Sequence, residues 1–171
     1  MTRPVSVLTV CLGNICRSPT AQAALEEAAT EIGLELEVRS AGTGGWHVGN
    51  PPDPRMRAAG ARVGLTIDGA AERVDRADLE HADLVLAMDR SNLRDLERLA
   101  SSAGIATPIV LFRDFDPAAA AGAEVPDPYY GGAEGFEEVV AICRRTATSL
   151  VALLAAGGVD AAVAARGSAQ P

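Results

Sequence analysis

The pattern of apolar and polar residues along the chain predicts short strands alternating with amphipathic helices. Continuous apolar runs at residues 5–10, 83–89 and 108–112 are too short for helices and predict buried strands. The segment 34–38 alternates apolar and charged residues, which predicts a strand with one solvated face. Such a strand belongs near an edge of the sheet.

Helical periodicity occupies the segments between and after these strands. Apolar residues recur at helical spacing from Ala21 to Ile32, and Gly33 ends the pattern. A short helix is predicted around residues 55–63, and another begins near Ser91, a good N-cap residue. The last predicted helix carries an unbroken apolar stripe, made of Phe136, Val139, Val140, Cys143, Ala147, Leu150, Val151 and Leu154.

Apolar strands that alternate with amphipathic helices indicate a parallel sheet covered on both faces. We predict an α/β fold of three layers (αβα), Rossmann-like, with a four-stranded, mainly parallel, twisted sheet. The predicted domain spans residues 1–156, and residues 157–171 are predicted to form a flexible tail. Ligands of such sheets bind beyond the carboxyl ends of the strands, where residues 11–17 follow the first one.

Composition narrows the classes of function. The chain has 171 residues, of which 48% are hydrophobic and 22% charged, as expected for one globular domain. Its net charge of -8 disfavours nucleic acid or an anionic membrane as a partner. No signal-peptide pattern is present, and we expect no apolar stretch near the roughly 18 residues of a membrane span. Three cysteines favour reduced thiols, so a soluble cytoplasmic protein is expected.

The stretch CLGNICRSP, directly after the first strand, contains the residue types of an anion site. Gly13 and Asn14 tolerate left-handed backbone, which lets successive amides face one point. Ser18 and Pro19 are predicted as the N-cap and first residue of a helix whose N-terminus attracts anions. Arg17 adds a planar fork suited to two phosphate oxygens.

Cys11 stands at the base of this loop and is the candidate nucleophile. Inward amides, a helix N-terminus and Arg17 together favour its thiolate over its thiol. The alternative is that Cys11 has no chemical role and is only a small buried residue at a strand end. No Gly-Lys-Ser/Thr follows the glycine, so the stretch is not a nucleotide-binding loop. Cys143 falls on the apolar stripe of the last helix and is predicted to lie in the core.

The run from Cys11 to Pro19 resembles the complete signature Cys-x-Gly-Asn-x-Cys-Arg-Ser-Pro of the low-molecular-weight protein tyrosine phosphatases. A second motif, DPYY at residues 127–130, resembles the segment that carries the general acid in that family. WHVGNPPDPR resembles its substrate loop, and MDRSNLRDL resembles a segment after a later strand. The resemblance covers about residues 5–155 and is closest to the bacterial, actinobacterial-like branch.

The resemblance implies an enzyme that hydrolyses phosphotyrosine or small aryl phosphate monoesters through a cysteinyl-phosphate, without metal or cofactor. Cys11 carries over as nucleophile, Arg17 as phosphate ligand and Asp127 as general acid. A carboxyl group is needed because the leaving phenol oxygen must be protonated as its bond to phosphorus breaks. The loop that would bind phosphate, sulfate or vanadate comprises Leu12, Gly13, Asn14, Ile15, Cys16, Arg17 and Ser18.

Other residues are implied in supporting roles. Trp46, Tyr129 and Tyr130 would wall the substrate cleft. Loop support is expected from Asn14, Ser18, Ser40 and Asp89. Cys16 is either filler or a redox guard that forms a reversible disulfide with Cys11. We expect a monomer.

One departure and three alternatives stay open. The family commonly has a histidine and often an arginine near Gly69 and Glu72, so a less rigid loop is expected here. A thioredoxin-linked arsenate reductase of the same fold would need two further cysteines, and residues 83–104 contain none. A protein-arginine phosphatase is the second alternative, because Ile15 lies where pocket width is set. A non-catalytic phosphate-binding module is the third.

Overall fold

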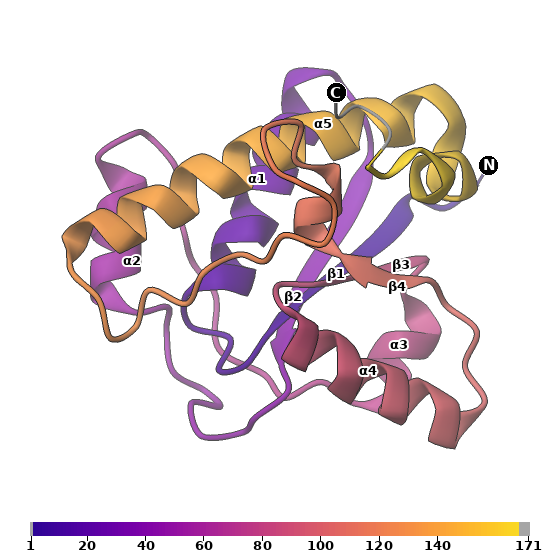
Figure 1. Cartoon of the computed structure of the whole chain (residues 1–171), viewed down its shortest axis with the longest axis horizontal. Helices are drawn as coiled ribbons and strands as arrows, with labels where there is room; N and C mark the ends of the chain where they lie inside the picture. The colour runs from indigo at the N-terminus through magenta and orange to yellow at the C-terminus, as the bar shows by residue number, and fades with distance from the viewer. Residues whose placement is uncertain (1, 168–171) are drawn as a thin grey trace.

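A computed structural model describes residues 2–167 of the chain (Figure 1). Its four strands are β1 (Val5–Cys11), β2 (Leu36–Gly42), β3 (Leu84–Ala87) and β4 (Ile109–Leu111). Its helices are α1 (Arg17–Glu31), α2 (Pro54–Ala61), α3 (Arg76–His81), α4 (Arg90–Ala103) and α5 (Ala133–Ala165), with a 3-10 turn, η1, at Phe112–Phe115. The short elements α3 and η1 were not predicted, because neither is long enough to show a helical repeat in the sequence.

The strands form one sheet in the order β2-β1-β3-β4, and every neighbouring pair is parallel. Helices α1, α2 and α5 cover one face of the sheet, while α3 and α4 cover the other (Figure 1). The predicted three-layer α/β fold is confirmed, and so is the edge position of β2. The sheet is wholly parallel rather than mainly so.

The central strand β1 shows why its sequence is mostly apolar and why its two polar residues, Ser6 and Thr9, are buried. Val7 belongs to the core under α1 and α5, whereas Leu8 and Val10 belong to the core under α3 and α4. A strand buried on both faces has no solvated side to hold polar residues. Because Cys11 is the last residue of β1, it lies at the carboxyl edge of the sheet.

Two helix starts differ from the prediction. Helix α1 begins at Arg17 with Cys16 at its N-cap, two residues before the predicted cap Ser18. The Ser18 hydroxyl lies within hydrogen-bond distance of other groups in the loop and is not a cap. Helix α4 is capped by Asp89, whose Oδ1 accepts from the backbone N–H of Asn92 at 2.8 Å, and not by Ser91.

The predicted flexible tail is wrong for residues 157–165. Helix α5 continues to Ala165, with a break at Gly158, where φ is 77°. Ala162 is completely buried beyond this break, and Val159 and Val163 pack on the same core. Small side chains allow this close packing although they give a weak signal in the sequence. Residues 168–171 of the predicted tail lie outside the described part.

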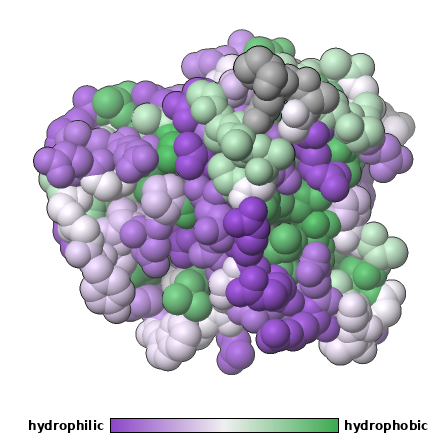
Figure 2. Space-filling view, in the orientation of Figure 1, coloured by the Kyte–Doolittle hydropathy of each residue, from purple (hydrophilic) through white to green (hydrophobic). Residues whose placement is uncertain are grey.

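Helix α5 also has the length and composition of a membrane span, with 33 residues and a hydropathy of 1.7 in its most apolar window. The expectation that no apolar stretch approaches this length is therefore wrong. The same criterion is met by core helices, and the α5 stripe from Phe136 to Leu154 packs in the core beside α1. Figure 2 shows hydrophilic residues over most of the left and lower parts of one face, with an apolar area right of centre.

Candidate active site

The loop between β1 and α1 folds around the sulfur of Cys11. Asn14 has a φ of 56°, the left-handed backbone predicted for this stretch. Its backbone N–H donates to Cys11 Sγ at 3.3 Å, and Ser18 Oγ lies 3.0 Å from the same sulfur. The sulfur of Cys11 is therefore surrounded by polar groups of the loop and faces the cleft described below, which distinguishes it from a core residue packed only by apolar side chains.

Asn14 fixes the loop through its side-chain amide. Its Nδ2 donates to Ser18 Oγ at 2.8 Å and to Ser40 Oγ at 3.0 Å. Its Oδ1 accepts from the backbone N–H of Glu72 at 2.9 Å. A backbone group of the 69–72 segment thus supports the asparagine in this chain, although Gly69 itself offers no side chain.

Arg17 is buried beneath the loop and held by an acid. Its Nη1 donates to Asp89 Oδ2 at 2.7 Å and to the carbonyl oxygen of Val125 at 3.2 Å. Its Nη2 lies 3.6 Å from Asp127 Oδ2. Burial alone would lower the pKa of Arg17, but the charge of Cys11 and the bond to Asp89 raise it above its usual value. The guanidinium keeps its positive charge at the floor of the site.

An open cleft of about 340 Å³ rises above this floor. Its lining is Cys11, Leu12, Gly13, Ile15, Cys16, Arg17, Trp46, His47, Asp127, Tyr129 and Tyr130. The rings of Tyr129 and Tyr130 meet edge to face with their centroids 4.9 Å apart. Trp46 is largely exposed to solvent. An aromatic wall beside an anion loop suits a planar aryl phosphate.

Asp127 reaches this cleft from the loop that precedes α5. Its Oδ1 accepts from the backbone N–H of Tyr129 at 3.1 Å, which fixes the carboxylate at the turn. The structure thus brings together the three residues expected to act in chemistry. Of the expected support residues, Ser40 contacts Asn14 and Asp89 contacts Arg17.

Cys16 lies in the cleft wall with Cys11, and both are free thiols. Burial, followed by the negative charges of Asp53 and Cys11, raises the pKa of Cys16 to about 12. Cys16 is therefore a protonated thiol at neutral pH. Cys143 is completely buried in the core, as its place on the apolar stripe predicts.

Sequence reasoning missed a pair of charged residues that brace the cleft. Arg55 binds Asp53 through Nη2 at 2.8 Å, and its Nη1 donates to the carbonyl oxygen of Tyr129 at 3.2 Å. Asp53 in turn donates its backbone N–H to the Ile15 carbonyl at 2.8 Å. The Asp-Pro-Arg sequence at the start of α2 signals a helix cap, but the contact with the loop is not visible in it.

Residues 6–159 match the family model described as low molecular weight phosphotyrosine protein phosphatase. The chain belongs to this family. A low molecular weight protein-tyrosine-phosphatase of Streptomyces coelicolor is 45% identical over 149 residues, covering 85% of this chain and 91% of the relative. This assignment confirms the predicted resemblance, the fold and the enzyme class: the chain is a low molecular weight protein-tyrosine phosphatase.

Solved structures of this phosphatase fold agree with the assignment. A protein tyrosine phosphatase from Entamoeba histolytica matches with a TM-score of 0.82 and 34% identity, over 90% of this chain and 98% of that one. A drosophila arginine phosphatase matches with a TM-score of 0.78 and 29% identity, over 85% and 95% of the two chains. The same fold thus accompanies two kinds of phosphoryl substrate in these neighbours.

Proposed function

We propose that this phosphatase hydrolyses phosphotyrosine monoesters in two displacements at Cys11, with Arg17 as the phosphate ligand and Asp127 as the general acid. The observation that carries the proposal is the convergence of these three side chains on one aromatic-walled cleft, Cys11 and Arg17 from the loop after β1 and Asp127 from the distant loop before α5. A loop that bound phosphate without chemistry would need Arg17 but neither the sulfur nor the carboxyl group.

In the first displacement, Cys11 Sγ attacks phosphorus and the bond from phosphorus to the phenol oxygen breaks. Arg17 and the loop amides hold the three other oxygens, where negative charge gathers in the transition state. Asp127 gives its proton to the leaving phenolate oxygen, so that a neutral phenol departs. The product on the protein is a cysteinyl-phosphate.

In the second displacement, water attacks the cysteinyl-phosphate while Asp127, now a carboxylate, accepts a proton from that water. The bond from sulfur to phosphorus breaks, and the electron pair returns to Cys11. Ser18 Oγ, 3.0 Å from the sulfur, donates its proton in a hydrogen bond that stabilises the departing thiolate. Inorganic phosphate then leaves the loop.

The aromatic wall supports an aryl phosphate as substrate. Tyr129, Tyr130 and Trp46 offer ring faces and edges at the cleft mouth, where a phenol ring can stack while its phosphate reaches Arg17. Phosphoarginine is the second candidate, since a protein described as an arginine phosphatase shares the fold and a planar guanidinium also stacks on aromatic rings. Cytoplasmic location and a monomeric state stay predictions from the sequence.

The test is the hydrolysis of phosphotyrosine, phenyl phosphate and phosphoarginine by the wild type, Cys11→Ser and Asp127→Asn. We expect vanadate-sensitive turnover of the aryl esters, its loss in Cys11→Ser, and a fall of about 10²- to 10⁴-fold for phenyl phosphate in Asp127→Asn. Asp95→Asn is the matched control, because the Asp95 side chain is 44% exposed and that of Asp127 46%.

Three results would contradict the proposal. Persistent turnover in Cys11→Ser would remove the covalent intermediate. Faster hydrolysis of phosphoarginine than of phosphotyrosine would assign the aromatic cleft to the second candidate. A wild type that binds phosphate but turns over none of the three compounds would leave only a binding module.

A further inference from the structure

A second cavity, of about 170 Å³, lies behind the phosphate loop. It is lined by Asn14, Pro19, Gln22, Arg39, Ser40, Pro52, Asp68, Gly69, Ala70, Ala71 and Glu72, and shares none of these residues with the substrate cleft. Gly69 leaves part of it open, because a Cβ there would meet no atom within 4 Å. We call this space the rear cavity. A liquid water occupies about 30 Å³, so there is room for one small ring.

Polar groups with unused hydrogen-bonding capacity line the rear cavity. Ser40 Oγ accepts from Asn14 Nδ2, but its own hydroxyl hydrogen has no acceptor among residues 2–167. Gln22 uses both hydrogens of Nε2, on Glu26 and the Val38 carbonyl, and its Oε1 has no donor within the same range. The cavity therefore offers a free donor and a free acceptor.

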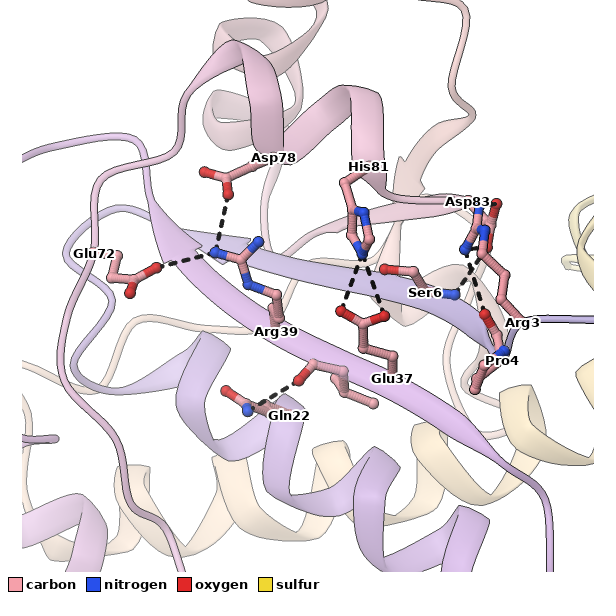
Figure 3. A network of polar contacts seen from close by, with 11 residues as sticks. Arg3, Pro4, Ser6, Gln22, Glu37, Arg39, Glu72, Asp78, His81 and Asp83 are labelled. Atoms are coloured by element: carbon pink, nitrogen blue, oxygen red, sulfur yellow. Dashed lines mark hydrogen bonds and ion pairs between the residues drawn. The ribbon is translucent and has the colours of Figure 1, made fainter.

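The charged groups of the rear cavity differ in how firmly they are engaged. Arg39, on β2, binds Glu72 at 3.3 Å and Asp78, on α3, at 3.1 Å. Figure 3 shows both contacts. Asp68 is 66% exposed and has one long contact, 3.5 Å to Arg57. Arg39 is thus engaged by two carboxylates, whereas the Asp68 carboxylate, with its single long contact, is available to a ligand.

We propose that the rear cavity binds a small neutral nitrogen heterocycle that carries both an N–H donor and an unprotonated ring nitrogen, with imidazole as the simplest member. The ring nitrogen accepts from the Ser40 hydroxyl, and the N–H donates to the Asp68 carboxylate. The flat ring lies against the apolar walls of Pro19, Pro52 and Ala70. A phosphate or carboxylate ligand is disfavoured, because Asp68 and Glu72 outnumber Arg39.

Binding in the rear cavity is coupled to the loop through Ser40. When its hydroxyl donates to a ligand, Ser40 Oγ becomes a stronger acceptor for Asn14 Nδ2, because hydrogen bonds in a chain polarise one another. Asn14 also donates its backbone N–H to Cys11 Sγ. The ligand therefore stabilises the loop shape that binds phosphate, and phosphate must strengthen ligand binding by the same factor. Its effect on turnover rests on the proposed function, whereas binding itself does not.

The experiment is an NMR titration of the full chain with imidazole at about pH 8, where the neutral ring predominates. We expect saturable shifts of the Asn14 side-chain amide and the backbone amides of Ser40 and Gly69, with a dissociation constant of about 1–10 mM for so small a ligand. In Asp68→Ala the affinity falls about fivefold, the size of one exposed hydrogen bond. The matched control Asp95→Ala leaves it unchanged.

Two further arms test the chemistry and the coupling. 1-Methylimidazole, which lacks the N–H donor, binds more weakly than imidazole. Saturating inorganic phosphate raises the imidazole affinity by roughly fivefold, the low end of the range for coupled sites. The absence of saturable shifts at the rear cavity would overturn the proposal. Shifts confined to the substrate cleft would overturn it too. Equal affinity of the methylated ring, or no effect of phosphate, also overturns it. Aryl phosphate turnover is assayed separately, so either hypothesis can fail alone.

Discussion

The support of the phosphate loop by Asn14 makes a quantitative prediction. Two substitutions separate its two roles: Asn14→Gly removes the side-chain bonds and keeps the left-handed backbone at no steric cost, whereas Asn14→Ala removes the bonds and adds that cost. The bonds in question run to Ser18, Ser40 and the backbone N–H of Glu72, at 2.8, 3.0 and 2.9 Å.

The expected losses of stability follow from these contacts. A hydrogen bond contributes about 1 kcal/mol net, and three bonds together contribute about 3 kcal/mol. Glu72 N–H borders the rear cavity, where water can replace part of the loss, so Asn14→Gly should cost about 2 kcal/mol. A φ of 56° adds about 1 kcal/mol for alanine, and Asn14→Ala should cost about 3 kcal/mol.

Urea denaturation measures both free energies of unfolding, and hydrolysis of an aryl phosphate measures the consequence for the site. We expect kcat/KM to fall about 10²-fold in both variants, because a displaced loop misaligns the amides that hold phosphate. Equal destabilisation by glycine and alanine would refute the backbone cost at Asn14. A loss below about 0.5 kcal/mol in both variants would refute the supporting role of the side chain.

Three other predictions concern a thiol, a buried acid and the cleft wall. Because the pKa of Cys16 is raised to about 12, iodoacetamide at about pH 8 should label Cys11 first, and mass spectrometry showing equal labelling would contradict this. Burial opposes the charge of Asp116, but hydrogen bonds from two arginines and a backbone amide lower its pKa to about 2. Its contribution of about 2 kcal/mol is present above about pH 4 and should be lost as pH falls to about 2, a dependence that urea titrations of Asp116→Asn should lack. A Cβ on Gly44 would overlap the ring of Trp46. Gly44→Ala should therefore displace Trp46 and raise KM for a phosphopeptide with little change in kcat for phenyl phosphate, and an unchanged KM would remove Trp46 from the cleft wall.

The parts of the site that could be predicted from the sequence are local in the chain. Cys11, Arg17 and Ser18 are fixed by one strand, one tight loop and one helix start, so their spacing largely determines their geometry. Asp127 could be added only through its motif, because nothing in the spacing from residue 17 to residue 127 indicates that the two segments meet. Cys11, Arg17 and Ser18 were thus predicted from local geometry, whereas Asp127 was predicted from a motif alone.

The parts that could not be predicted depend on backbone groups and small side chains. The donor to Asn14 Oδ1 is the backbone N–H of Glu72, and a backbone amide leaves no mark on the residue type. The extension of α5 to Ala165 rests on Ala162 packing closely beyond Gly158, which resembles flexible composition in the sequence. In both cases the three-dimensional neighbour, and not the residue itself, supplies the interaction.

The two acids beside Arg17 differ in how firmly they hold its guanidinium, and this difference bears on how a chain of net charge -8 can bind an anion. Asp89 holds the guanidinium at 2.7 Å with a side chain only 21% exposed and also caps α4, so it stays in place when phosphate arrives. Asp127 lies at 3.6 Å with a side chain 46% exposed, so its contact with the buried guanidinium is longer and more solvated than that of Asp89. An incoming phosphate can therefore replace Asp127 at Arg17 at little cost. In the proposed mechanism this exchange frees the carboxyl group of Asp127 from Arg17 while keeping it in the cleft, where its proposed role is to protonate the leaving oxygen.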